Sequence, residues 1–590
     1  MTRYIKALCI MILIIYIISF QPLAFAENTA SSDIPFTDVP KTSYAFSAIN
    51  ELRQLGITNG IGNNLFGYGQ TVTRGEFVTF LVRLMGWEQI TPVSGSFSDN
   101  RDTLKFFYSS VETALAKGVI SKEPGNFRPL DAITREEAAI MLVNCLGYGT
   151  LAGQLDYFSK PFPDVENHIG YITIARDLGI FNGTSIGFEP DGSALREQVA
   201  AILVRMSNAL KRPVKDLNAF YAISSSSQQD KIADLSSICF GWSSLSYDEK
   251  SGNIVVNNSR SDLGYNDYYL PAGFTQRLAS AKQAGIPALL MLYSTQNFKM
   301  KNPDTDLTTG IPEYVLAHPE VYRKLINDII LSINNTTLGS ETGSFDGVVI
   351  DMEGLKGADL KQSFNDFLKE LKTALDKENK KLYVAVHPLI HPKRSAVCMD
   401  GYDYRTIGSL ADKVILMAHD YDAKKLTQAD MDRGFDITPL TPLEDVYYAL
   451  QTITDKTDGV LDKTKIMLQL SFDWTVWHEK DGKILNSVHD SFSMENFIKL
   501  LESDTPLSFN YSEEYANPYI KYTDPKSGVE NTVWYENTSS ILEKIKLARL
   551  FGIQGISLWR LGQIPDYQPA DKDVHEMDIW QSVLNEMEKR

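Results

Sequence analysis

Cysteine is scarce in this chain, which has only four among 590 residues: Cys9, Cys145, Cys239 and Cys398. They are scattered and include no CxxC pair, so the sequence contains neither a disulfide framework nor a thiolate metal site. A chain without such cross-links must rely on hydrophobic cores. At this length we expect several domains, each with a core of its own.

Positive charge is also in short supply. The 57 lysines and arginines stand against 74 acidic residues, giving a net charge of −17. Such a chain lacks the basic field that would recruit nucleic acid or an anionic membrane. A small ligand with one anionic group is still compatible with this balance.

Long apolar runs are absent beyond the first 26 residues, so no later segment is predicted to span a membrane. Residues 1–26 place Arg3 and Lys6 before an apolar stretch that ends in Ala24-Phe25-Ala26. This pattern predicts a cleaved secretory signal, and an uncleaved anchor helix is the alternative. We therefore expect export, and no membrane attachment after cleavage.

Three similar segments occupy residues 34–90, 95–150 and 160–210. They begin PFTDVP, SFSDN and PFPDVE, and each ends in a helical pattern that starts VTRGEF, ITREEA or ALREQV. The spacing predicts helix, loop and helix in every copy. Thr73 with Glu76, and Thr134 with Glu137, are placed to form capping boxes, whereas Leu195 cannot cap the third copy.

These copies resemble the S-layer homology domain, through the FxDV start and the [IV]TRxE motif. The resemblance implies an all-α repeat domain that anchors a protein to a secondary cell-wall polysaccharide of Gram-positive bacteria. It also implies that Arg74, Arg135 and Arg196 contact an acidic sugar, because a guanidinium fits a carboxylate. The alternative is that these arginines only pair with neighbouring acids. The serine-rich residues 211–234 are predicted to be a linker.

From residue 235 to 590, short β-rich runs alternate with amphipathic helical segments. Eight candidate strands over about 350 residues favour a (β/α)₈ (TIM) barrel, with an open doubly wound sheet as the alternative. No GxGxxG or P-loop follows a strand, which weakens that alternative. The candidates are ICFGWSSL, GYNDYYLP near 264, PALLMLYS, FDGVVIDME, LYVAVHP, VILMAHDYD, IMLQLSFDW and GISLWRLG.

The candidate catalytic residues lie on the strand FDGVVIDME. Side chains alternate along a strand, so Val349, Asp351 and Glu353 share one face, and the two acids lie at its carboxyl end. Two carboxylates held close in a partly desolvated place cannot both ionise easily, so one pKa rises. An acid that stays protonated near neutral pH can protonate a leaving group. Asp346 is near the strand start, where a structural role is favoured over substrate binding.

DGVVIDME resembles the DGxDxDxE signature of glycoside hydrolase family 18, the chitinase-like fold. The resemblance implies that Glu353 is the general acid and that Asp351 orients the 2-acetamido group of the substrate. The acetamido oxygen would then be the nucleophile, so that configuration is retained. The further residues expected to contact substrate are Asp346, Met417, His419, Asp420, Tyr421, Trp474 and Trp559.

The sequence departs from the family pattern at two positions: Val349 replaces an acid and His419 replaces a tyrosine. No HxE or HxH companion accompanies the acids, so no metal and no organic cofactor are predicted. His387 and His391 are interpreted as rim residues rather than a metal pair, and Trp474 is as compatible with a core position as with a subsite.

The sequence therefore predicts a secreted hydrolase anchored in the cell wall or S-layer of a Gram-positive-type bacterium. Its predicted substrate is a β-linked N-acetylglucosamine glycan, either peptidoglycan or chitin-like. Two other interpretations remain open: a catalytically inactive, lectin-like surface protein, and a surface protein in which the barrel is a spacer.

Overall fold

The computed structural model describes residues 35–588, apart from residues 124, 156–158, 261–267, 393–397, 422–424, 435–438 and 567–575. The predicted signal at residues 1–26 lies outside this part of the chain. The chain forms two compact units. The first comprises Met1–Lys117, Ser121–Thr134 and Ser193–Val204, and the second comprises Gly118–Ile120, Arg135–Gly192 and Arg205–Arg590. None of the described helices is both long enough and apolar enough to cross a membrane.

The first unit is built from helices joined by loops. Its helices are α2 (Phe46–Gln54), α3 (Arg74–Leu84), α4 (Tyr108–Ala116) and the first part of α8 (Arg196–Leu210). The predicted capping box of α3 is confirmed: the Thr73 hydroxyl accepts from the Glu76 N–H at 3.2 Å, and the Glu76 carboxylate accepts from the Thr73 N–H at 2.9 Å. Isolated β-bridges link the segments, such as Thr73 with Ala132.

The aspartate of each repeat start fixes the loop that carries the aromatic residue. Asp38 accepts hydrogen bonds from the backbone N–H groups of Phe66, Gly67 and Tyr68 at 2.7 to 2.9 Å. In the second unit Asp164 accepts in the same way from Phe188 and Glu189. The first turn of every repeat is thus tied to a loop more than twenty residues later. The repeat helices of this unit are α5 (Arg135–Cys145), α6 (Gly149–Gln154) and α7 (Ile169–Asp177).

Eight parallel strands of the second unit form a closed barrel. Pairing of β1 with both β19 and β2 closes the ring, so the open doubly wound sheet is excluded. The TIM-barrel prediction is confirmed. In order around the barrel the strands are β1 (Asp216–Tyr221), β19 (Gly555–Trp559), β12 (Ile466–Ser471), β11 (Lys413–Leu416), β10 (Lys381–Val386), β9 (Gly347–Glu353), β4 (Ala288–Thr295) and β2 (Ser237–Asp248).

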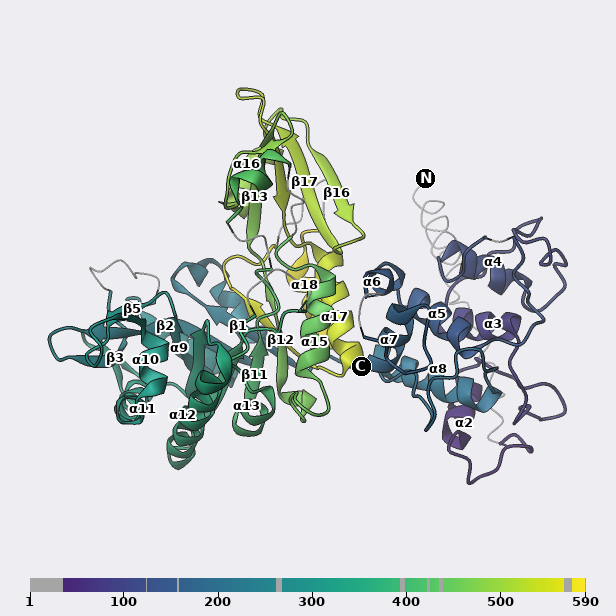
Figure 1. Cartoon of the computed structure of the whole chain (residues 1–590), viewed down its shortest axis with the longest axis horizontal. Helices are drawn as coiled ribbons and strands as arrows, with labels where there is room; N and C mark the ends of the chain where they lie inside the picture. Colours follow the sequence, from purple (N-terminus) through teal and green to yellow (C-terminus); the bar gives the residue numbers. More distant parts are fainter. Residues whose placement is uncertain are drawn as a thin grey trace, which may run out of the picture. The chain divides into compact units, whose positions relative to one another are not determined.

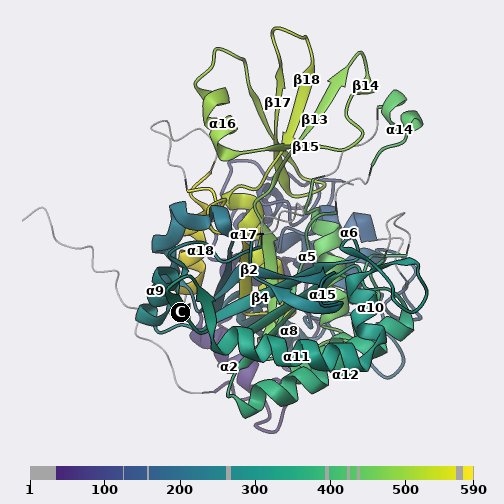
Figure 2. The same ribbon diagram turned by 90° about the vertical axis from the view of Figure 1, so that its left-hand side faces the viewer.

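Helices cover the outside of this barrel (Figures 1 and 2). They are α9 (Phe274–Ala284), α10 (Ile311–Ala317), α11 (Pro319–Asn334), α12 (Gly357–Lys377), α13 (Tyr404–Leu410), α15 (Leu443–Ile453), α17 (Thr538–Phe551) and α18 (Ile579–Glu588). Short hairpins accompany the first strands: β3 (Asn253–Asn257) on β2, β5 (Lys299–Lys301) with β6 (Thr308–Gly310), and β7 (Thr336–Leu338) with β8 (Glu341–Gly343).

The structure corrects the predicted linker at residues 211–234. This segment contains barrel strand β1 and the 3₁₀ helix η2 (Ile223–Asp234), so the barrel begins well before residue 235. The serine run is ordered locally, since the Ser225 hydroxyl accepts from the Ala222 N–H at 2.9 Å. Of the candidate strand GYNDYYLP, residues 264–267 lie outside the described residues, and residues 268–271 are not a strand.

A lobe of antiparallel sheet is inserted between β12 and β19, and no part of it was expected from the sequence. Figure 1 shows it as the yellow-green sheet that projects from the barrel. It comprises β13 (Trp474–Lys480), β14 (Lys483–Ile484), β15 (Asp490–Phe492), α16 (Met494–Leu501), β16 (Ser508–Ser512), β17 (Asn517–Thr523) and β18 (Glu530–Trp534). The short helix α14 (Gln428–Asp432) contacts β14.

Candidate active site

Two carboxylates lie side by side on one face of β9, as the alternation predicts. Strand β4 flanks them, with Tyr293 opposite Asp351 and Thr295 opposite Glu353. Asp351 is 4% exposed, and Val349 below it is fully buried. Because both acids belong to a barrel strand that is paired with β4 along this stretch, the backbone holds them close together on one face.

Burial changes the protonation of this pair. It raises the pKa of Asp351 well above its usual range, and the charge of Glu353 adds to the effect. Burial and the charge of Asp420 raise the pKa of Glu353 to about 7, although His419 and a hydrogen bond from Tyr293 oppose them. The pair therefore keeps a proton at neutral pH, which is the condition for general acid catalysis. The Asp351 Oδ1 atom is buried and has no hydrogen-bond donor among the described residues.

His419 follows β11 and lies between two oxygen atoms. Its Nδ1 is 2.9 Å from Asp420 Oδ2 and its Nε2 is 2.7 Å from Gln469 Oε1. Burial lowers the pKa of the ring, but Asp420 and the hydrogen bonds to Asp420 and Gln469 outweigh it and raise that pKa to about 9. Both ring nitrogens of His419 thus contact side-chain oxygen atoms of the protein, at the position where the family has a tyrosine.

Sequence reasoning missed three residues that the barrel brings to the same end. Gln469 comes from β12, and Asp473 follows that strand, where its Oδ1 accepts from Gln563 Nε2 at 3.1 Å. Burial and the charge of Asp420 raise the pKa of Asp473. Tyr293 stacks on Tyr268 with ring centroids 4.4 Å apart. The sequence signal for Asp473 is its place at the end of the apolar run IMLQLSFDW, next to Trp474.

Three of the remaining predicted substrate contacts come from segments at the barrel mouth. Met417 and Trp559 both pack against the hydrophobic interior of the barrel, and Trp559 ends β19 with its ring 5.2 Å from that of Phe220. Tyr421 comes two residues after His419, and its N–H donates to the Leu440 carbonyl. These positions are compatible with the predicted roles of Met417, Tyr421 and Trp559.

Two predicted contacts do not belong to this cluster. Asp346 precedes β9 at the opposite end of the barrel, where its carboxylate accepts from the Ala288 N–H at 2.9 Å. Trp474 is 4% exposed and stacks on Tyr535, with ring centroids 4.8 Å apart, in the core of the inserted lobe. These contacts favour the structural role for Asp346 and the core alternative for Trp474 over substrate binding.

The arginines of the repeats hold successive repeats together. The Nε atom of Arg74 donates to the Phe127 carbonyl at 2.8 Å, and Arg135 donates in the same way to Phe188 at 2.6 Å. Arg196 returns to the first repeat, donating to the Phe66 carbonyl at 2.8 Å, and forms an ion pair with Glu76 at 2.5 Å. Arg135 and Arg196 are both buried. A contact between these guanidinium groups and a wall sugar remains a prediction.

Comparison with known families decides the classification. The model for "Glycosyl hydrolases family 18" matches residues 220–563, which is more than half of the chain, and the S-layer homology domain matches residues 35–78, 96–139 and 161–200. The chain belongs to glycosyl hydrolases family 18. The predicted order, three S-layer homology repeats followed by the family 18 domain, is confirmed.

Three curated proteins are similar to parts of the chain. The Bacillus subtilis protein YdhD, whose name describes a sporulation-specific glycosylase, is 25% identical over 44% of this chain and 56% of its own length. The cortical fragment-lytic enzyme of B. subtilis is 26% identical over 54% of this chain and 71% of its own length. A cell surface protein of Thermoanaerobacter kivui is 30% identical over 32% of this chain and 23% of its own length. The chain thus spans little more than half of the first of these relatives.

Proposed function

We propose that this protein is a glycoside hydrolase attached to the bacterial cell wall, and that it cleaves β-linked N-acetylglucosamine glycans. The observation that carries the proposal is the pair on β9. Glu353 is placed beside Asp351 at the carboxyl end of a barrel strand, and burial raises its pKa to about 7. The family assignment and the likeness to a cortical fragment-lytic enzyme support the same class of substrate.

In this proposal the two acids have different tasks. Glu353 protonates the glycosidic oxygen of the leaving group. Asp351 holds the 2-acetamido group, whose carbonyl oxygen attacks the anomeric carbon, so configuration is retained without an enzyme nucleophile. The intermediate carries positive charge, which an ionised Asp351 stabilises. Support comes from the buried Asp351 Oδ1, which has no protein donor among the described residues and can accept from the acetamido N–H.

Trp559 is the proposed floor of the sugar site. It ends β19 partly exposed and packs against the barrel interior, so an indole face is held rigidly at the carboxyl ends of the strands. Apolar faces of pyranose rings pack favourably on such a surface.

The three repeats are proposed to dock the protein on a secondary wall polysaccharide, with Arg74, Arg135 and Arg196 as candidate contacts. The family match and the likeness to a cell surface protein support a location at the bacterial cell surface. Tethering would raise the local concentration of wall glycan around the barrel, so a modest catalyst would suffice.

Release of reducing ends tests the catalytic proposal. The purified chain is incubated with peptidoglycan and with N-acetylglucosamine oligomers, beside Glu353→Gln. We expect release by the native chain alone, since removal of a general acid costs about 10²- to 10⁴-fold in rate. The departures from the family pattern at Val349 and His419 favour one alternative function, that of a catalytically inactive, lectin-like protein. Binding of both proteins without any release would establish the lectin and refute the hydrolase.

Pelleting with purified cell walls tests the anchor. We expect Arg74→Ala combined with Arg135→Ala to reduce the pelleted fraction. Arg83→Ala is the matched control, because Arg83 also donates to a backbone carbonyl, that of Ile57, but lies outside the TRxE motif. Circular dichroism must show folded repeats in all variants. Equal pelleting of the double variant and the control would remove the arginines from the anchoring site.

A further inference from the structure

The histidine that replaces the family tyrosine is held by side-chain oxygen atoms at both ring nitrogens. Both ring nitrogens of His419 face oxygen atoms, Asp420 Oδ2 at 2.9 Å and Gln469 Oε1 at 2.7 Å, and the side chain is 7% exposed. A neutral imidazole has one N–H and can satisfy only one acceptor. Two acceptors at hydrogen-bond distance are satisfied together only when the ring is doubly protonated.

The surrounding charges favour the same state. The charged groups that act on this ring are acids, and His387 is kept neutral, since burial and the charge of His419 lower its pKa to about 4. Arg560 lies beyond Asp473 and acts on that acid. The titratable groups that interact electrostatically with His419 are Asp351 and Glu353 of β9, His387 after β10, Asp420 beside it, and Asp473 after β12.

We infer that His419 is an imidazolium throughout the neutral pH range, that Gln469 and Asp420 position it, and that its charge favours ionisation of the Asp351–Glu353 pair. A cation beside two acids favours their ionised forms and so opposes the effect of burial. In the family pattern an acid at position 349 shares in controlling this pair, and here Val349 has no charge. The control is therefore exerted from the barrel mouth and not from beneath the acids.

The consequence for catalysis rests on the proposed function and has a definite sign. The reaction needs Asp351 ionised and Glu353 protonated, so activity rises with the first ionisation of the pair and falls with the second. Removing the cation raises both pKa values, and both limbs of the pH–activity curve move to higher pH. An opposite charge within a few ångströms is worth about 1 pH unit or more.

The first experiment needs no activity. The chain has eight histidines, so ring-¹⁵N labelling gives a tractable spectrum, in which His419 is assigned by the signals lost in His419→Gln. We expect both ring nitrogens to be protonated at pH 7 and to titrate only near pH 9. A single neutral tautomer at pH 7, with the Gln469 amide turned to donate its N–H, would overturn the inference.

The second experiment is the pH–activity profile of variants on whichever glycan the native chain cleaves. His419→Gln keeps a hydrogen-bonding side chain without the charge, and should move both limbs upward by about 1 pH unit. Gln469→Leu should move them in the same direction by less. His318→Gln is the matched control, because that ring also lies between two acceptors, Tyr314 O at 2.7 Å and Asp304 Oδ2 at 3.0 Å, but outside the barrel mouth.

These readouts separate the two claims. A slower His419→Gln enzyme with an unshifted profile would show a purely structural histidine and refute the inference. If no glycan is cleaved but the spectrum shows the imidazolium, the proposed hydrolase fails and the assignment of charge stands.

Discussion

Replacing Glu353 by glutamine should stabilise the fold at alkaline pH while removing the proposed acid. The pKa of Glu353 is raised from 4.5 to about 7, so the folded protein binds this proton more tightly than the unfolded chain does. Below pH 4.5 both states are protonated and the effect vanishes. Between pH 4.5 and 7 the unfolded chain releases the proton first, and stability falls as pH rises. Glutamine has no such dependence.

The size of the effect follows from the shift. A change of 2.5 pKa units corresponds to about 3 kcal/mol in the free energy of unfolding, reached in full above pH 7. The barrel and its inserted lobe comprise roughly 370 residues, so the entropy of unfolding is about 0.8 kcal/mol/K and the melting temperature should rise by about 4 °C.

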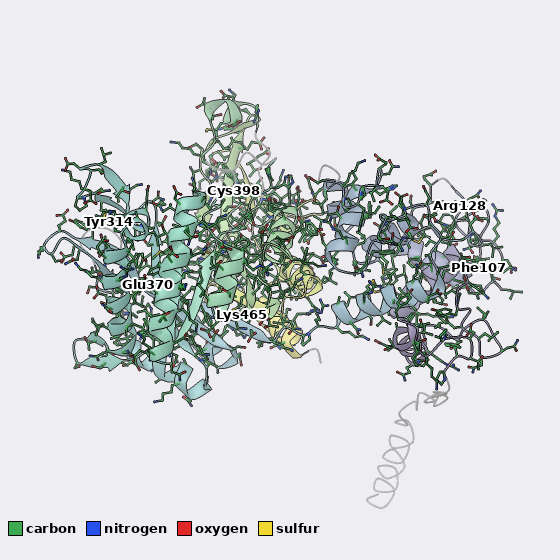
Figure 3. All side chains as sticks on the ribbon, turned by 60° about the horizontal axis from the view of Figure 1, so that its bottom comes forward. Phe107, Arg128, Tyr314, Glu370, Cys398 and Lys465 are labelled. Carbon is green, nitrogen blue, oxygen red and sulfur yellow. The ribbon has the colours of Figure 1, made fainter. Side chains whose placement is uncertain are left out.

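Thermal unfolding of the native chain and Glu353→Gln at pH 4 and pH 8 measures this directly. We expect equal melting temperatures for the barrel transition at pH 4 and a higher one for the variant at pH 8. Glu370→Gln is the control: this glutamate, labelled on α12 in Figure 3, is 38% exposed and its pKa is lowered by a hydrogen bond from Arg323. A variant that is destabilised equally at both pH values would refute the reasoning about a desolvated acid.

Four further substitutions probe separate parts of the second unit. Trp559→Ala should raise KM for the glycan about tenfold or more, which steady-state kinetics measures. Trp474→Ala should lower the stability of the inserted lobe by about 3–5 kcal/mol, which thermal unfolding measures. Lys544→Ala should destabilise the fold by about 3–5 kcal/mol, because it leaves the buried Glu536 carboxylate without its partner at 2.9 Å, and denaturant unfolding measures it. Val349→Asp should unfold at lower denaturant and gain no activity, since it buries an unpaired charge.

The barrel was predictable because parallel strands buried on both faces read as short apolar runs. Strand β1 was missed because Asn218 interrupts its run. That side chain is fully buried, and its partners, Ser237 and Ser557, belong to strands 19 and 339 residues away. The Asn218 side chain finds these hydrogen-bond partners only in the closed barrel. No local signal therefore distinguishes this strand from a polar linker.

The candidate site was predictable to the extent that it lies on one strand. The alternation along β9 places Asp351 beside Glu353 without any knowledge of the fold. Gln469 and Asp473, by contrast, reach the site from β12, more than a hundred residues later, through the pairing of β12 with β11 and β19. A residue whose role depends on register between distant strands has no signature in its own segment.

The two departures from the family pattern, Val349 and His419, depend on each other. Val349 is paired with Met291 on β4 and Tyr383 on β10, and all three belong to the hydrophobic interior of the barrel. A carboxylate there would have neither solvent nor a cationic partner, so the charge that tunes the catalytic pair has to come from the barrel mouth. His419 meets that requirement, because it lies where acids from β9 and from the segment after β12 converge and where Gln469 holds its second nitrogen. An apolar interior beneath the acids and a cation beside them are therefore expected to occur together, and changing one without the other should leave the pair wrongly protonated at neutral pH.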